Sequence, residues 1–170
     1  QMRVGLNTGD VILCDIGASS NRVDLTIIGD AVNVASRMES AAKLYGLDHL
    51  ISEGTENRTN DHFEYRLIDR VIVKGKNVPV NCYQLLSEKG QSPSIQQNLQ
   101  ETYDNALQAY FSGDFIAAMN GFEKSSEFEE SKESRDDTNL NPSQVFLNRC
   151  KHLIEEKPKQ WDGVWEFLIK

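Results

Sequence analysis

The sequence predicts an α+β fold over its first half and a small all-α unit after it. Residues 1–88 contain several short apolar runs with the length and β-branched content of strands, around one long amphipathic helical stretch. Residues 98–170 instead place aromatic and aliphatic side chains at helical spacing. Between these halves, residues 89–97 are polar, contain Gly and Pro, and are expected to be a linker.

Length and composition narrow the function classes. The 170 residues could hold one ordinary domain or two small ones, and 39% hydrophobic residues are enough for a core. A net charge of -8 argues against a general nucleic-acid binder, because no basic stripe could replace the counterions of a phosphate backbone. The three cysteines show no CxxC spacing, which predicts neither disulfides nor a zinc site and favours the cytoplasm. No apolar run approaches the roughly 20 residues of a bilayer-crossing helix, so a membrane anchor would have to lie outside this chain.

The chain opens on two predicted strands. Arg3–Asn7 is typical of a buried strand, Thr8–Asp10 of a tight turn, and Val11–Ile16 of a second strand. The small polar residues 17–21 predict a connecting loop.

The next segment, Arg22–Ser40, reads RVDLTIIGDAVNVASRMES and joins a strand directly to a helix. Gly29 allows a turn, and Asp30 is placed to cap a helix that runs to about Tyr45. Three apolar side chains suit a buried strand before the turn: Leu25, Ile27 and Ile28.

One face of this helix carries an amide and a guanidinium. Asn33 and Arg37 lie four residues apart and share a face. Arg presents a rigid fork of donors that matches phosphate oxygens, and an Asn amide can orient a sugar or a developing charge. On an arbitrary helix the same spacing is usually a solvated face, so spacing alone does not decide. Four other residues are expected to point towards a core: Val32, Ala35, Met38 and Ala42.

The remainder of the first half predicts shorter elements. Residues 48–52 predict a strand, 53–60 one or two helical turns, 63–73 a pair of strand-like runs, and 79–86 a last strand. Lys74 lies in a Lys-Gly-Lys turn between the last two, where a lysine ordinarily faces solvent. The strand residues expected in the core are Val78, Val80, Tyr83 and Leu85.

The order of these motifs resembles a known family. The run TxxGDxVNxASRxE follows RVGLNTGDVxxxxIG at Arg3–Gly17 and precedes VKGK and PVNCYQLL. Together they resemble the second half of the class III nucleotidyl cyclase catalytic domain, the adenylate/guanylate cyclase family, over about Arg3–Leu86. The resemblance implies a partial ferredoxin-like domain that converts ATP to cyclic AMP and pyrophosphate at a site between two subunits, with a homodimer expected.

The resemblance also implies residue roles. Arg37 is expected to stabilise the phosphoryl transition state, Asn33 to orient the ribose, and Lys74 to pair with substrate phosphates. Thr26 takes the base-selecting position, where its hydroxyl favours adenine and animal receptor guanylate cyclases carry Cys. The family's metal-binding aspartates have no counterpart in this sequence. The ligands of Mg²⁺ or Mn²⁺ are therefore expected upstream of this chain, and the isolated chain is predicted to be an inactive fragment. The alternative is a non-catalytic cyclase-like half joined to an interaction module.

The second half predicts three helices. Its pattern YxxALxxYxxGDFxxAxxxFE, beginning at Tyr103, resembles one tetratricopeptide-like helix pair. Residues 127–141 are acidic and predict a mobile loop, and Pro142 suits the first turn of a third helix. Such a pair buries little by itself, so it must pack on the first half, a partner chain or upstream repeats. Trp161 and Trp165 are expected to cover this packing, and the end of the tail resembles that of some bacterial cyclases.

Overall fold

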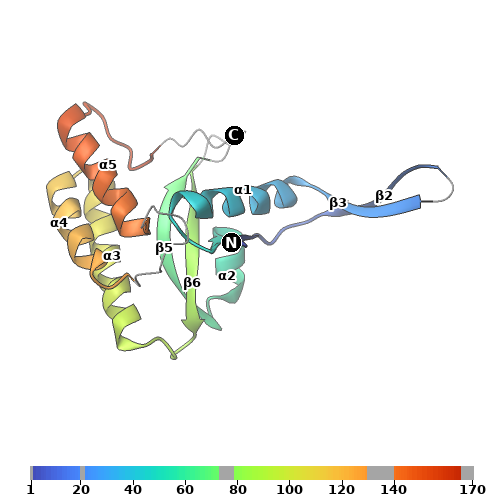
Figure 1. Cartoon of the computed structure of the whole chain (residues 1–170), viewed down its shortest axis with the longest axis horizontal. Helices are drawn as coiled ribbons and strands as arrows, with labels where there is room; N and C mark the ends of the chain where they lie inside the picture. The colour runs from blue at the N-terminus through green and yellow to red at the C-terminus, as the bar shows by residue number, and fades with distance from the viewer. Residues whose placement is uncertain (1, 20–21, 73–78, 130–139, 166–170) are drawn as a thin grey trace.

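The computed structural model describes residues 2–19, 22–72, 79–129 and 140–165. In chain order, the elements are β1 (Val4–Leu6), β2 (Ile12–Ser19), β3 (Arg22–Ile28), α1 (Asp30–Leu44), β4 (His49–Ser52), α2 (Glu53–Thr59), β5 (Phe63–Val71), β6 (Val80–Glu88), α3 (Ser94–Ser112), α4 (Phe115–Ser126) and α5 (Pro142–Glu156). The fold is the predicted mixture of a sheet and helices. Figure 1 shows a two-stranded ribbon projecting at one end, a sheet with α1 and α2 in the middle, and α3 to α5 at the other end.

The central sheet has four strands in the order β1-β4-β6-β5. β1 runs parallel to β4, while the β4–β6 and β5–β6 pairs are antiparallel. The last strand predicted for the first half is confirmed as β6, which pairs with β5, and the two strand-like runs predicted at residues 63–73 form the single strand β5. Within the part of the chain that the structure describes, no helix is long and apolar enough to cross a membrane.

Helix α1 follows its predicted bounds closely, but its details differ. Gly29 is the N-cap and Asp30 is the first helical residue, so the predicted Asp30 cap is wrong. The buried face is also shifted along the helix from the predicted one. It consists of Val34, Met38, Ala41 and Ala42, whereas Val32 and Ala35 are only half-buried. A Cβ on Gly5 would lie 2.0 Å from the Ala35 carbonyl oxygen, so β1 packs against the backbone of α1.

Two predictions about the first strands are wrong. Residues 8–10 do not form a hairpin turn, because β1 pairs with β4, and Val4 donates its backbone N–H to the Asp48 carbonyl at 2.8 Å. Strand β2 pairs with β3 instead, as a separate antiparallel ribbon. Residues 17–19 belong to β2 and not to a loop.

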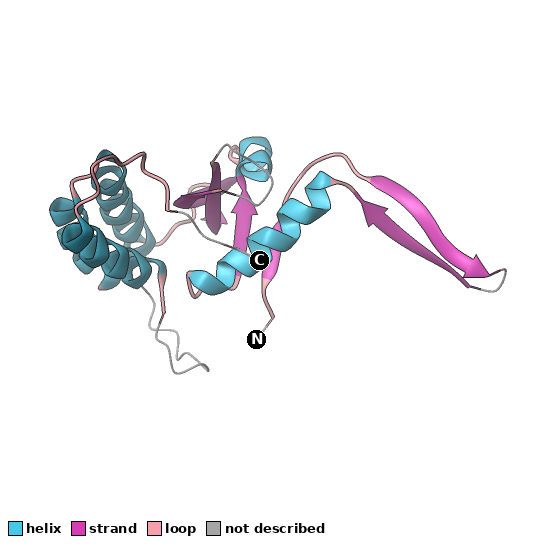
Figure 2. Cartoon of the chain, turned by 90° about the horizontal axis from the view of Figure 1, so that it is seen from above, coloured by secondary structure: helices cyan, strands magenta, loops and turns pink. Residues whose placement is uncertain are grey.

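The predicted burial of the first strand and of β3 is also wrong, because Val4 and Leu6 of β1 are exposed. Leu25 is 69% exposed, Ile27 50% and Ile28 49%. The ribbon extends away from the rest of the chain, as both Figure 1 and Figure 2 show, so its apolar residues have strand propensity but little cover. Strand propensity therefore predicted the element correctly, but not its environment.

The three helices of the tail form as predicted, with the first beginning earlier. Helix α3 starts at Ser94, so the linker predicted at residues 89–97 is shorter. Gly113 ends α3 in the left-handed region at φ 85°, and the Asp114 carboxylate caps α4 by accepting from the Ala117 amide at 3.0 Å. Pro142 lies in the first turn of α5 as expected.

The tail packs on the first half of the chain, through a hydrophobic cluster that is continuous between them. The aromatic side chains at its centre are fully buried: Tyr103, Tyr110, Phe122 and Phe146. Trp161 packs against Tyr110 and donates its indole N–H to the Tyr110 carbonyl at 2.8 Å. Of the three packing partners considered for the tail, the structure shows the first half of this chain. The division into two domains and the tetratricopeptide likeness stay predictions.

Some predictions fall outside the described residues. These are the substrate-binding role of Lys74, the core position of Val78 and most of the loop at 127–141. Glu129, at the start of that acidic stretch, is described and is paired with Arg66.

Candidate functional site

The candidate site begins on the first turns of α1. Asn33 is exposed and Arg37 is half-buried, while the opposite helix face packs into the core. Neither side chain hydrogen-bonds or forms an ion pair with another described residue. The amide and the guanidinium therefore lie away from the core, with their donors available to a ligand.

Thr26 lies on β3, immediately before this helix. It is half-buried and stands opposite Cys14 across the ribbon. The strand connects to α1 through Gly29, whose φ of 152° favours glycine. A Cβ at this position would lie 3.2 Å from the Asp10 carbonyl oxygen, so the backbone approaches closely here. A tight, constrained connection thus links the strand that carries Thr26 to the helix that carries Asn33 and Arg37.

Asn7 anchors the beginning of α1, a role that sequence reasoning missed. Its side-chain amide donates to the Ala31 carbonyl at 2.9 Å, and its Oδ1 accepts from the Ser52 hydroxyl at 2.5 Å. One side chain thereby ties the first turn of α1 to the end of β4. The signal in the sequence is an amide that directly follows the short strand β1.

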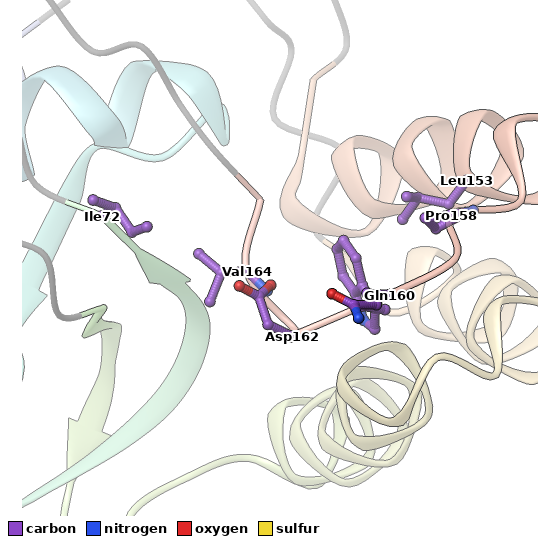
Figure 3. Close-up of a pocket in the computed structure, with 7 residues that line it drawn as sticks. Ile72, Leu153, Pro158, Gln160, Asp162 and Val164 are labelled. Atoms are coloured by element: carbon purple, nitrogen blue, oxygen red, sulfur yellow. The ribbon is translucent and has the colours of Figure 1, made fainter.

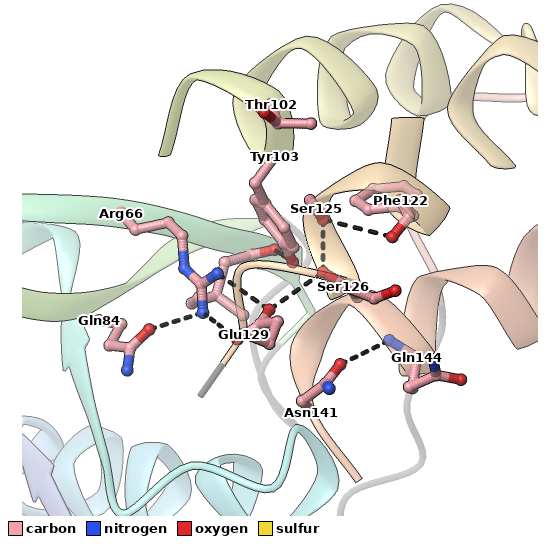
Figure 4. A network of polar contacts seen from close by, with 12 residues as sticks. Arg66, Gln84, Thr102, Tyr103, Phe122, Ser125, Ser126, Glu129, Asn141 and Gln144 are labelled. Carbon is pink, nitrogen blue, oxygen red and sulfur yellow. Dashed lines mark hydrogen bonds and ion pairs between the residues drawn. The ribbon is translucent and has the colours of Figure 1, made fainter. Parts of the chain in front are cut away.

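Other charged residues near the sheet hold the tail in place. Arg66 is fully buried on β5, donating to Glu129 at 3.0 Å and to Gln84 at 2.7 Å (Figure 4). Its guanidinium also lies 4.7 Å from the centre of the Tyr103 ring. Ser143 on α5 donates to the same Glu129 carboxylate. These contacts pair both terminal nitrogens of Arg66 inside the protein, although its buried Nε has no hydrogen-bond partner among the described residues, and we assign Arg66 a structural role.

A second buried group connects three elements. Asp69 on β5 accepts from Tyr45 at the end of α1 and from Arg149 on α5. Burial and the neighbouring Asp69 carboxylate hold the pKa of Tyr45 well above its ordinary value, so its phenol stays protonated and donates. Sequence reasoning missed this group, because its members lie far apart in the sequence and no local pattern links them.

A pocket lies between the end of β5 and the C-terminal segment (Figure 3). Its lining is Ile72, Leu153, Pro158, Gln160, Trp161, Asp162 and Val164. Of the predicted site residues that the structure describes, Thr26, Asn33 and Arg37, none lines it, and we assign it no role in the candidate site.

Whether the described residues could bind a catalytic metal ion depends on which side-chain donors lie close together. Among the described residues, no group of three His, Cys, Asp or Glu side chains could hold a metal ion. No step below is derived through a metal.

Comparisons with known proteins identify the family. Residues 1–87 match the family described as adenylate and guanylate cyclase catalytic domain. The terminal-differentiation specific adenylate cyclase of Dictyostelium discoideum is 32% identical over an alignment of 156 residues that covers 89% of this chain and 7% of that protein. The adenylate cyclase of Anabaena cylindrica is 41% identical over 85 residues, covering 48% of this chain and 17% of that protein. A crystal structure of the adenylyl cyclase CyaB from P. aeruginosa is 35% identical, covering 54% of this chain and 45% of that one, with a TM-score of 0.44.

The matches differ in how far they extend. A match over 89% of the chain must include part of α3 to α5, so the likeness to the Dictyostelium protein reaches into the tail. This chain spans only a small part, 7% and 17%, of the two curated relatives. The family match covers half of the chain, and the predicted resemblance is confirmed: the chain belongs to the adenylate and guanylate cyclase catalytic domain family.

Proposed function

We propose that this chain forms part of an adenylate cyclase that converts ATP to cyclic AMP and pyrophosphate. One observation carries the proposal. Asn33 and Arg37 lie one turn apart on a helix fixed to the core, without partners among the described residues. An amide and a guanidinium held in this way suit a ribose and a phosphate. The adenylate cyclases among the relatives support the choice of reaction.

The proposed chemistry is positional and involves no covalent enzyme intermediate. The ribose 3′ hydroxyl gives up its proton to solvent as its oxygen attacks the α-phosphorus; a new P–O bond forms, and the bond to pyrophosphate breaks. Arg37 stabilises the negative charge that develops on the phosphoryl oxygens, and Asn33 orients the ribose for attack. We assign Lys74 to pairing with the substrate phosphates because of its position in the VKGK motif.

The metal belongs elsewhere in this proposal. The metal-binding aspartates of the family have no counterpart in this sequence, so we assign Mg²⁺ or Mn²⁺ to residues upstream of this chain. When bound, such an ion would neutralise phosphate charge. This chain would supply the orienting and charge-stabilising side chains.

A second cyclase subunit is part of the proposal, and the β2–β3 ribbon supports it. Ile12 stands opposite Ile28, and Leu13 opposite Ile27. Because neighbouring residues in a strand point to opposite faces, both faces of the ribbon carry apolar side chains. Exposed apolar surface of this kind marks interaction sites, and a second copy of this domain is the partner we propose.

The test of the proposed function is Arg37→Ala. The purified chain, given ATP and Mn²⁺, should make no cyclic AMP. In an assembly that supplies the metal-binding half, Arg37→Ala should lower turnover by about 10² to 10³ while weakening ATP binding far less, because Arg37 acts on transition-state charge. Arg58→Ala changes an exposed arginine on α2 and serves as the matched control. An unchanged rate would remove Arg37 from the site, and an assembly that never turns over would favour the non-catalytic alternative.

Base choice is tested separately with Thr26→Cys in the same assembly. If the Thr26 hydroxyl meets the adenine edge, the preference for ATP over GTP should fall by a factor of about 2 to 10. This corresponds to the roughly 0.5 to 1.5 kcal/mol of one neutral hydrogen bond. The two side chains are close in size, so the ribbon should keep its structure. An identical ATP to GTP ratio in both proteins would show that Thr26 is only a strand residue.

A further inference from the structure

Helix α1 is attached at its two ends by different parts of the chain. Asn7 ties its first turn to β4, as described above. The end of the helix is instead attached to β5 and to the tail, through Tyr45. Asn33 and Arg37 lie between these two attachments, so both influence where the candidate site residues point.

One part of the attachment at the end of α1 is a set of hydrogen bonds to the Tyr45 hydroxyl. The Tyr45 hydroxyl donates to Asp69 Oδ2 at 2.5 Å and accepts from Arg149 Nη2 at 3.2 Å. Arg149 Nη1 donates to the same Asp69 oxygen at 2.6 Å. Asp69 accepts a further bond from the Arg70 amide at 2.7 Å. The Tyr45 hydroxyl therefore connects α1 to both β5 and α5.

A backbone contact at the same place comes from the residue before the cap of α5. Gly46 follows Tyr45 and has a φ of 67°. A Cβ at Gly46 would lie 1.8 Å from the Leu140 carbonyl oxygen, so the tail backbone presses directly on the turn that leaves α1. This contact does not involve the polar group and indicates the same connection independently.

The polar group is completely enclosed. Tyr45, Asp69 and Arg149 are all buried, and the Arg149 guanidinium also lies 4.6 Å from the centre of the Phe146 ring. Buried polar groups of this kind have few alternative partners, so their geometry is sharply defined. The end of α1 consequently has one well-determined position as long as the tail is docked.

We propose that the docked tail sets the orientation of α1, with Tyr45 and Arg149 as positioning residues for Asn33 and Arg37; this rests on the proposed function. Asn33 lies twelve residues before Tyr45, or roughly 18 Å along the helix axis at about 1.5 Å per residue. A tilt of about 3° at the Tyr45 end would therefore move Asn33 by roughly 1 Å. A misplacement of about 1 Å can cost about 10² in rate.

The test compares two substitutions that each remove one buried hydroxyl. Tyr45→Phe keeps the ring and the Arg149–Asp69 pair but removes the hydrogen bonds that join the end of α1 to Asp69 and Arg149. Tyr103→Phe is the matched control. Tyr103 is equally buried, and its hydroxyl donates at 3.1 Å to the carbonyl of Ile68, which lies on β5 next to Asp69. Arg149→Lys is a second variant, which keeps a positive charge beside Asp69 but loses the forked contact.

The first measurement is hydrogen exchange of the α1 amides in the purified chain, which needs no activity. Tyr45→Phe and Arg149→Lys should speed exchange in α1 about 2- to 10-fold relative to Tyr103→Phe. Equal exchange in α1 for Tyr45→Phe and Tyr103→Phe would overturn the inference.

The second measurement is turnover in the assembly that supplies the metal-binding half. Tyr45→Phe should lower kcat about 10- to 100-fold with KM for ATP within about twofold, while Tyr103→Phe changes neither. Equal kcat in the two variants would overturn the positioning role. If Tyr45→Phe speeds α1 exchange in the purified chain but the assembly never makes cyclic AMP, the tail still sets the orientation of α1 and the proposed function is rejected.

Discussion

The projecting β2–β3 ribbon exposes apolar side chains, whereas the interface between β5 and the tail buries charged ones. On the ribbon, Ile12 and Leu13 are both 65% exposed. At the tail interface, Arg66, Asp69 and Arg149 are buried. The contrast separates two kinds of contact. The interface with the tail buries its charged side chains against other described residues of this chain, whereas the described residues leave the apolar side chains of the ribbon exposed.

The buried charges are tolerable because each has a partner. Arg149 pairs with Asp69, and Arg66 pairs with Glu129. Burying an ion pair gains little net stability, but removing one partner is costly, since the remaining charge is left uncompensated. The tail is consequently held in one arrangement by requirements of pairing as well as by apolar area.

Among the substitutions that test this comparison, Arg149→Leu is expected to have the largest effect on the free energy of unfolding. The substitution leaves Asp69 buried without its counter-charge, which should lower the free energy of unfolding by about 3 to 5 kcal/mol. Urea unfolding of the purified chain measures it. Arg70→Leu is the control, because Arg70 is half-exposed and stacks on Phe111 at 4.1 Å, a contact worth about 1 kcal/mol. Equal losses in the two variants would show that the Arg149–Asp69 pair is no more important than a surface contact.

On the ribbon, a substitution should affect self-association and leave the stability of the single chain almost unchanged. Leu13→Ser should change the free energy of unfolding of the single chain by no more than about 0.5 kcal/mol, since the side chain is exposed. It should weaken self-association by about 1.5 to 3 kcal/mol, or roughly 10- to 100-fold in Kd, because a buried leucine is lost from the contact. Sedimentation velocity over a range of concentrations measures this.

The matched control for the ribbon is Ile116→Ser on α4, which removes an apolar side chain that is 63% exposed. It should leave self-association unchanged. If both substitutions weaken association equally, the contact is not specific to the ribbon. If the unsubstituted chain never associates, the partner of the ribbon is not a second copy.

The same contrast explains what could be predicted from sequence. Periodicity locates elements, so α1 and the buried Tyr103 and Tyr110 of α3 agree with the predictions. Periodicity does not reveal what covers an element, which is why the β3 residues were expected to be buried. The Tyr45–Asp69–Arg149 group joins residues up to 104 positions apart, and no local pattern reports such a pairing.

The candidate site likewise contains residues that the sequence could predict and residues whose roles depend on tertiary contacts. Asn33, Arg37 and Thr26 were found because their motifs resemble a family, and the structure adds where they lie and that α1 presents the first two. Asn7 and Gly5 were missed, because a tertiary contact gives each its role. The roles of Asn33, Arg37, Thr26 and Lys74 in catalysis stay predictions.

The smallest expected effect concerns Asp104 on α3, which is half-buried and so lies between the two extremes. Burial raises the pKa of Asp104 to about 6, although Arg66 lowers it in part. An aspartate in the unfolded chain titrates near about 3.9. The folded state therefore keeps this proton over the interval in which the unfolded chain releases it. The stability that Asp104 contributes is fully present below about pH 4 and is lost as the pH rises through about 6.

Asp104→Asn should remove this dependence. The difference in unfolding free energy between the original chain and the variant should change by about 1 kcal/mol or less between pH 4 and pH 7, because solvent screens a half-buried carboxylate. Urea unfolding at several pH values measures it, and Asp61→Asn, at an exposed position, is the control. A difference that stays constant across this range would mean that water reaches Asp104 freely. The margin of α3 would then resemble the uncovered ribbon more than the enclosed interface beside it.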